Sequence, residues 1–85
     1  MKAKKKVKKK RKLIFDEVGV NAFALRLKEL RKEHNFTQEQ LAFESGLSLS
    51  QIARIETARI NPTLSTLIVI AKAMGIKLSE LCDID

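Results

Sequence analysis

Residues 37–56, TQEQLAFESGLSLSQIARIE, contain two helix starts around one glycine, and this arrangement decides the fold. A hydroxyl residue stands three positions before a glutamine in Thr37–Gln40 and again in Ser48–Gln51. This spacing is the capping box, in which the hydroxyl and the amide satisfy backbone N–H groups at a helix start. Gly46 ends the first helix after about two turns, because glycine readily adopts the left-handed conformation found at helix C-termini. The stretch predicts two short helices joined by the turn Gly46-Leu47-Ser48, which forces a wide crossing angle.

The second of these helices has an apolar side and a hydrogen-bonding side. At about 100° per residue, Ile52 and Ile55 lie within about 60° of each other and face the core. The opposite side gathers hydrogen-bonding residues and no acid: Ser50, Gln51, Arg54 and Thr57. Such side chains suit the major groove of DNA, where arginine pairs with guanine, glutamine with adenine, and serine with either. Leu49, at the leading end, is placed to contact a thymine methyl group.

Glu56 falls about 40° from Ile52 on the same wheel, near the core side of the helix. A carboxylate in that position needs a partner, because burying an unpaired charge is costly. We expect the partner to be Arg31, near the end of a helix predicted over about 21–34. The alternative is that Glu56 lies at the rim of the domain and is solvated.

Helical patterns continue on both sides of this stretch. A helix over about 21–34 is predicted from one apolar face, made by Phe23, Leu27 and Leu30. Thr63 can cap a helix that ends at Gly75, whose apolar stripe is Leu64, Leu67, Ile68, Ala71 and Met74. A short fifth helix, with Lys77 as a poor cap, follows from Ile76, Leu78 and Leu81. Only residues 13–15 could also fit a strand, so the sequence predicts an all-α, five-helix domain over residues 21–85.

Three single residues have ordinary structural explanations. His34 is expected to be exposed at a helix end. Cys82 is expected to act as a small apolar residue and not as a redox switch. Phe43 projects about 160° from Leu41 on the wheel, and we expect it to be partly buried against a neighbour; the alternative is a contact with a partner.

The 85-residue chain has a net charge of +7, but its charge is unevenly divided. Residues 1–12, MKAKKKVKKKRK, hold nine of the 17 basic side chains and no acid. Residues 13–85 therefore hold eight bases and all ten acids, a net charge of −2. A segment as charged as residues 1–12 is expected to be disordered when free and to bind a polyanion. Residues 13–20 are expected to form a connector between this tail and the domain.

The tail has three interpretations. Twelve extended residues reach roughly 40 Å, so the tail can follow DNA as an arm that binds phosphates without reading bases. It can instead be a solubilising extension without a partner. In a eukaryotic host, KKKRK can act as a nuclear-import patch. We favour the DNA-binding arm.

Composition excludes several classes of site. A single cysteine excludes an intramolecular disulfide, and one cysteine with one histidine excludes the usual structural zinc sites. No apolar run approaches the ~20 residues that cross a bilayer, and no signal peptide is evident. The sequence shows no nucleophile–base pair and no phosphate-binding glycine loop. We expect a non-enzymatic, cytoplasmic, nucleoid-associated protein without a metal, a cofactor, a membrane contact or a small-molecule ligand.

The stretch from Arg26 to Leu81 resembles the Cro and lambda-repressor type helix-turn-helix domain, also called the XRE family. The resemblance covers about two thirds of the chain and rests on the motifs LKELR, TQEQLA, the Gly-Leu-Ser turn, IARIE, NPTLSTL and IAKAMGI. It implies five helices, with the helix over about 49–57 in the major groove and an ion pair between Arg31 and Glu56. The family often has glycine where this chain has Ala58, so the loop that follows is expected to be reshaped.

The residue pattern and the resemblance together lead to two sets of expected DNA contacts. Base contacts are expected from Gln38, Leu49, Ser50, Gln51 and Arg54. Phosphate contacts are expected from Thr37, Ser48, Thr57, Arg59 and Asn61 in the domain, and from Lys8, Lys9, Lys10, Arg11 and Lys12 in the tail.

The expected function is that of a sequence-specific regulator of transcription that occupies double-stranded DNA. A homodimer is expected, because one helix covers few base pairs and two-fold pairing places half-sites about 34–36 Å apart. The resemblance implies that the fifth helix and the end of the fourth form the dimer surface. One alternative is an antitoxin-like module that binds a toxin protein and autoregulates its operon. Another is a nucleoid-type protein that binds DNA nonspecifically through the tail.

Overall fold

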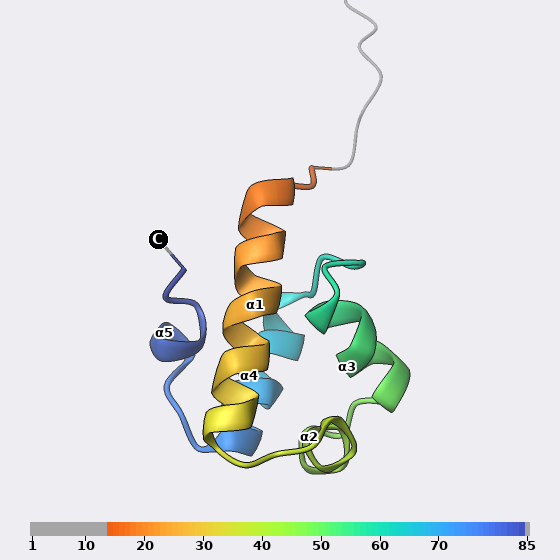
Figure 1. Ribbon diagram of the computed structural model, residues 1–85, viewed down its shortest axis with the longest axis vertical. Helices are drawn as coiled ribbons and strands as arrows, with labels where there is room; N and C mark the ends of the chain where they lie inside the picture. Colours follow the sequence, from red (N-terminus) through yellow and green to blue (C-terminus); the bar gives the residue numbers. More distant parts are fainter. Residues whose placement is uncertain (1–13, 85) are drawn as a thin grey trace, which may run out of the picture.

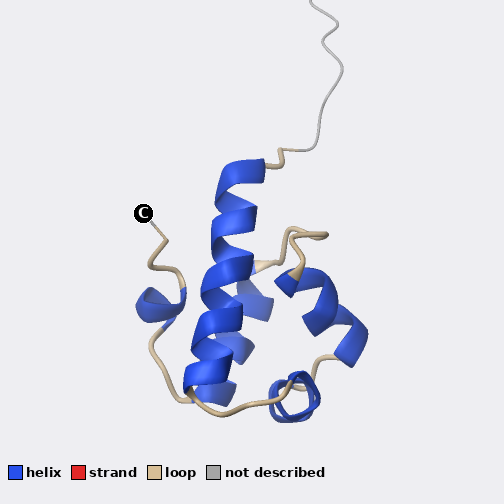
Figure 2. Cartoon of the chain, in the orientation of Figure 1, coloured by secondary structure: helices blue, strands red, loops and turns tan. Residues whose placement is uncertain are grey.

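The structure, a computed structural model, describes residues 14–84, and this part of the chain contains five helices and no strand. The helices are α1 (Glu17–Glu33), α2 (Gln38–Ser45), α3 (Leu49–Glu56), α4 (Leu64–Met74) and α5 (Leu78–Leu81). Figure 1 shows α1 along the middle of the molecule, with α4 behind it, α5 on one side and α2 and α3 on the other. Short loops join the helices (Figure 2). The predicted all-α, five-helix fold is confirmed.

Both predicted capping boxes are present. Thr37 Oγ1 accepts the Gln40 N–H at 3.0 Å, and Gln40 Oε1 accepts the Thr37 N–H at 2.8 Å. Ser48 and Gln51 make the same two bonds at the start of α3, at 3.0 and 3.1 Å. Thr63 caps α4 with its hydroxyl oxygen, as predicted. The starts of these three helices are therefore fixed by residues adjacent in sequence.

Helix α1 begins four residues before its predicted start. Asp16 is the cap, since its Oδ1 accepts the Gly19 N–H at 3.0 Å, and Glu17 adds a negative charge at the positive end of the helix. The prediction that the connector extends to residue 20 is wrong for residues 17–20. The cap bond outweighs the low helix propensity of Gly19 in the first turn. The poor cap predicted for α5 is confirmed, because the Lys77 side chain makes no cap bond.

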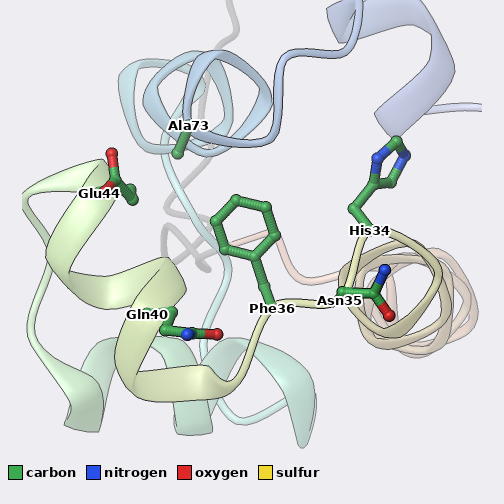
Figure 3. A pocket seen from close by; sticks show the side chains of 6 residues that line it. All are labelled: His34, Asn35, Phe36, Gln40, Glu44 and Ala73. Atoms are coloured by element: carbon green, nitrogen blue, oxygen red, sulfur yellow. The ribbon is translucent and has the colours of Figure 1, made fainter.

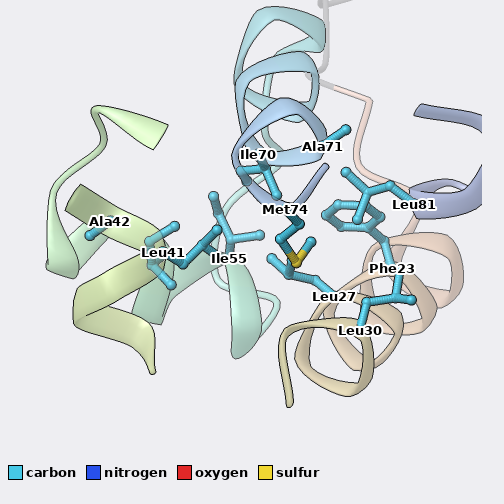
Figure 4. Close-up of a cluster of buried hydrophobic side chains, with 11 residues drawn as sticks. Phe23, Leu27, Leu30, Leu41, Ala42, Ile55, Ile70, Ala71, Met74 and Leu81 are labelled. Atoms are coloured by element: carbon cyan, nitrogen blue, oxygen red, sulfur yellow. The ribbon is translucent and has the colours of Figure 1, made fainter. Parts of the chain in front are cut away.

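All five helices contribute to one buried apolar cluster (Figure 4). Its members are Phe23, Leu27, Leu30, Leu41, Ala42, Ile52, Ile55, Ile70, Ala71, Met74 and Leu81. The predicted apolar face of α1 and the two predicted anchors of α3 are among them. Burying a leucine or isoleucine side chain contributes about 1.5–3 kcal/mol, so the two isoleucines fix the orientation of α3.

The buried face of α4 differs from the predicted stripe. Leu64 is 62% exposed, because it lies in the first turn of α4, and Leu67 and Ile68 are only half-buried. Ile70, which the stripe omits, is fully buried. Helix α4 packs against both α2 and α5, so it buries a wider face than a single stripe and leaves its first turn open.

Phe43 is 84% exposed, so the prediction of partial burial is wrong. Helix α2 buries Leu41 and Ala42, and the next residue points about 100° away from Ala42, where no other helix covers it. His34 is exposed at the end of α1, as predicted. Cys82 is exposed and does not contribute to the buried cluster, contrary to the expectation of a small apolar residue.

Helices α1 to α4 all end in the same backbone motif. A left-handed residue follows each helix, and the next N–H bonds back to a carbonyl five residues earlier, as in a Schellman motif. The left-handed residues are Asn35, Gly46, Ala58 and Gly75. The residue after each is apolar and packs on the core in three cases, Phe36, Leu47 and Ile76. The fourth is Arg59, which is exposed, so the end of α3 carries a charge where the other helices carry a core contact.

A buried hydrogen-bond network joins α1, α2 and α3. Arg31 Nε lies 2.5 Å from Glu56 Oε2, and Arg31 Nη2 lies 3.1 Å from Glu56 Oε1, so the pair is bidentate. Arg31 Nη1 also donates to the Phe36 carbonyl at 2.7 Å, and Gln38 Nε2 donates to Glu56 Oε1 at 3.0 Å. Arg31 is therefore the partner of Glu56 that the helical wheel predicts. One guanidinium fixes the end of α1, the following turn and the end of α3.

Ala58 adopts a φ of +58°, a conformation that disfavours residues with a Cβ. We predict that Ala58→Gly stabilises the protein by about 0.5–1 kcal/mol, because relief of the left-handed strain exceeds the extra entropy of glycine in the unfolded chain. Ala53→Gly, inside α3, is the matched control and should cost about 1 kcal/mol. Urea unfolding measures both. A lower midpoint for Ala58→Gly would show that the alanine is not strained.

Removing Glu56 leaves the Arg31 guanidinium buried without its partner. We predict that Glu56→Ala lowers the free energy of unfolding by about 3–5 kcal/mol. Glu29→Ala, which removes an exposed carboxylate from α1, is the control and should change it by less than about 0.5 kcal/mol. Chemical denaturation of both variants provides the measurement. Equal midpoints for the two variants would contradict a structural role for the pair.

Candidate nucleic-acid interface

Helix α3 presents a polar side to solvent. Ile52 and Ile55 are 0% and 1% exposed and hold the opposite side of the helix against the core. Ser50, Gln51 and Arg54 are exposed. Leu49 is 43% exposed at the start of the helix, next to the α2–α3 turn. Three hydrogen-bonding side chains therefore stand on a helix whose position is fixed, which is the arrangement that precise recognition of a ligand requires.

The charge of this surface is positive. Between residues 45 and 63 the charged residues are Arg54, Glu56 and Arg59. Glu56 is buried in the ion pair, so two exposed guanidinium groups remain. The exposed acids of the described part lie before α1 or on α1, α2 and α5, or just after α5. Although residues 13–85 have a net negative charge, α3 and the loop after it expose only positive charges, which favour an anionic partner.

Two capping hydroxyls at this surface keep a free proton. Thr37 Oγ1 and Ser48 Oγ each accept one backbone N–H, and neither hydroxyl has an acceptor for its own proton within residues 14–84. Both residues are exposed, at the starts of α2 and α3, where the helix dipole is positive. Each hydroxyl can therefore donate to a phosphate oxygen without giving up its cap bond.

Two other predicted contact residues already make hydrogen bonds within the protein. Thr57 Oγ1 donates to the Ala53 carbonyl at 2.9 Å, so its proton is in use and the geometry does not favour a contact with a phosphate. Gln38 is half-buried, and its Nε2 donates to Glu56. Gln38 therefore keeps its amide oxygen free, and the ion pair fixes its position beside α3.

The loop after α3 places its two predicted phosphate contacts differently. The Arg59 N–H bonds to the Arg54 carbonyl at 2.9 Å, which keeps Arg59 at the end of α3 with an exposed side chain. Asn61 is exposed but lines a hollow of about 190 Å³ together with Val20 and Ile84. The structure therefore brings Arg59 to the α3 surface and turns Asn61 toward α1 and the C-terminal segment.

Lys28 is a residue of this surface that the sequence analysis missed. It lines a hollow of about 330 Å³ with Thr57 and Ala58, where α1 passes the end of α3. Its ammonium group adds positive charge at the edge of the surface. The available signal was its position three residues before Arg31, which places both on one face of α1.

The rest of the molecule gives less support for a binding site. The predicted tail contacts, Lys8, Lys9, Lys10, Arg11 and Lys12, lie outside the described residues. A hollow of about 340 Å³ at the α1–α2 corner is lined by mixed side chains, with the Phe36 ring directed toward Ala73 (Figure 3). Residues 14–84 contain no cluster of three metal-binding side chains. None of the helices described is long and apolar enough to cross a membrane.

The sequence and the fold of this chain are similar to those of known proteins. The family model described as Helix-turn-helix matches residues 27–81. The immunity repressor protein of Bacillus phage phi105 is 50% identical over 56 residues, which are 66% of this chain and 39% of that protein. The cryptic phage CTXphi transcriptional repressor RstR of Vibrio cholerae is 42% identical over 57 residues, 67% of this chain and 51% of that protein. The crystal structure of the restriction-modification controller protein C.AhdI from Aeromonas hydrophila has a TM-score of 0.73 and 36% identity, covering 75% of this chain and 97% of that chain.

The two repressors are longer than the matched region, and the alignments span about two fifths and one half of their lengths. The controller protein is matched over nearly its whole chain. The family match begins within α1 and ends at the last residue of α5, so it includes the buried ion pair and the α3 surface. The chain belongs to the helix-turn-helix family, of the XRE type that its motifs resemble.

Proposed function

We propose that this protein is a sequence-specific, double-stranded-DNA-binding regulator of transcription that reads bases with α3. The observation that carries the proposal is that Ser50, Gln51 and Arg54 are exposed on a helix that the buried Ile52 and Ile55 hold against the core. The related proteins named above are two repressors and a controller protein, which supports a regulatory role. Nothing in these relatives supports the antitoxin-like alternative.

The geometry suits the major groove. An α-helix with its side chains is about 10–12 Å across, and the groove is about 12 Å wide. With α3 in the groove, Thr37 and Ser48 present free hydroxyl protons at the N-terminal ends of α2 and α3. Arg59 lies at the other end of α3. These groups can bind phosphates on both sides of the reading face and so set its register. The protein then acts by occupying its site, without a chemical reaction of its own.

The short reading helix favours a two-fold dimer on DNA. Helix α3 has eight residues and is about 12 Å long, so one copy spans only a few base pairs. The dimer surface proposed here includes α5 and the end of α4. It also includes the adjoining face of α1, where Val18 and Leu25 are exposed and Arg26 bonds to the Glu80 carbonyl of α5. Two copies place two reading helices in successive major grooves.

Selection of bound sequences from random DNA, followed by footprinting, tests the proposal. We predict a motif with two half-sites about 34–36 Å apart. Arg54→Ala should bind the best site more weakly by about 1–3 kcal/mol and lose the preference at one position in each half-site. Glu44→Ala, which removes an exposed charge from the last turn of α2, is the control and should leave the motif unchanged. Equal binding of random and selected DNA would instead favour the nonspecific, nucleoid-type function.

The tail is proposed to bind the DNA backbone on either side of the motif. Replacing the nine basic residues of the segment 1–12 by glutamine should weaken binding to all sequences. The slope of log affinity against log salt should fall in magnitude by about 0.9 for each phosphate that the tail no longer binds, while the selected motif stays the same. Titrations at several salt concentrations measure the slope. An unchanged slope would leave the tail without a role in DNA binding.

A further inference from the structure

We infer that Gln51 recognises a hydrogen-bond acceptor on a base, on guanine or thymine, and not the edge of adenine. The inference rests on the proposed function, in which α3 enters the major groove. It concerns the specificity of that site, and it replaces the adenine contact expected from residue type alone.

The capping box fixes which end of the Gln51 amide faces outward. Gln51 Oε1 accepts the Ser48 backbone N–H at 3.1 Å, while the Gln51 N–H bonds to Ser48 Oγ at 3.0 Å. The group that faces the Ser48 N–H has to be the oxygen, because the amide nitrogen of glutamine only donates. Within residues 14–84 the Nε2 group has no acceptor, and the side chain is exposed. The amide therefore offers N–H groups to a ligand.

To recognise adenine, a glutamine must offer its amide oxygen to the base as well as its amide nitrogen. Adenine presents N7 as an acceptor and N6 as a donor in the major groove, so glutamine must turn its oxygen and its nitrogen to the base together. The Gln51 oxygen is directed at the Ser48 N–H, and a paired contact with adenine requires the amide to rotate so that its oxygen and nitrogen lie together along the base edge, which weakens the cap bond. Guanine, with N7 and O6, and thymine, with O4, accept from N–H groups and leave the cap intact.

Two neighbouring exposed side chains also lack a hydrogen-bond acceptor. Arg54 lies one turn further along the exposed side of α3 and offers only donors. Leu49, two residues before Gln51, is exposed and apolar, which suits a thymine methyl group. The reading face therefore combines donors with an apolar contact. Its complement is a half-site in which α3 reads guanine and thymine.

The variant Gln51→Glu separates the reading role of Gln51 from its capping role. Glutamate serves equally well as the fourth residue of a capping box, so the helix start and the melting temperature should be retained. The N–H donors are removed, and the carboxylate can accept from the amino group of cytosine. Gln40→Glu is the matched control, because Gln40 makes the same box at the start of α2 and lies at the α1–α2 corner with Phe36 (Figure 3).

The experiment is selection of bound DNA with the full-length wild type and both variants. We expect one position of the wild-type half-site to favour guanine or thymine. Gln51→Glu should weaken that preference by about two- to tenfold, the value of one hydrogen bond, and shift it toward cytosine. Gln40→Glu adds the same charge and should keep the wild-type motif.

Two outcomes would overturn this inference and leave the proposed function intact. One is an adenine preference in the wild type that Gln51→Glu removes, which would show that the amide oxygen reads DNA. The other is a Gln51→Glu motif identical to that of Gln40→Glu, which would show that the side chain only caps the helix. A wild type that selects no motif would overturn the proposed function, and this inference with it.

Discussion

The bidentate ion pair between Arg31 and Glu56 is the interaction on which the functional surface depends. Helix α3 has only two turns, and an isolated helix of that length is unstable in water. Its two isoleucines attach it to the core, but they do not fix both of its ends. The guanidinium holds the end of α3, and its bond to the Phe36 carbonyl ties the same group to the turn before α2. A buried pair contributes little net stability compared with apolar packing, and here its role is to fix orientation.

The parts of the fold that could be predicted from the sequence are those set by residues close together in the chain. Capping boxes and terminal glycines act within four residues, so the bounds of α2 and α3 could be predicted closely. The face of α4 and the exposure of Phe43 could not, because they depend on which distant helices cover which side. The early start of α1 was missed for another reason. Gly19 indicated a break, although its N–H completes the Asp16 cap.

The sequence predicts which side chains of the candidate site are exposed, but it does not predict which of their hydrogen-bonding groups are already used within the protein. The helical wheel places Ser50, Gln51 and Arg54 on the solvent side, where they lie. The wheel cannot show that Gln51, Gln38 and Thr57 use part of their hydrogen-bonding capacity within the protein. In a domain this small, side chains that stabilise helix ends also stand on the recognition surface. The bonds that they make for folding determine which groups remain for a ligand.

The early start of α1 has a further consequence for how the two charged parts of the chain cooperate. The first turn of α1 lies beside the loop after α3, since Val20 and Asn61 line one hollow. The nine basic residues of the segment 1–12 precede this turn in the sequence. If the tail binds the same duplex as α3, as proposed above, its contact becomes intramolecular and is governed by an effective concentration. In that case, avidity within one chain would slow the dissociation of a domain of net negative charge from a polyanion.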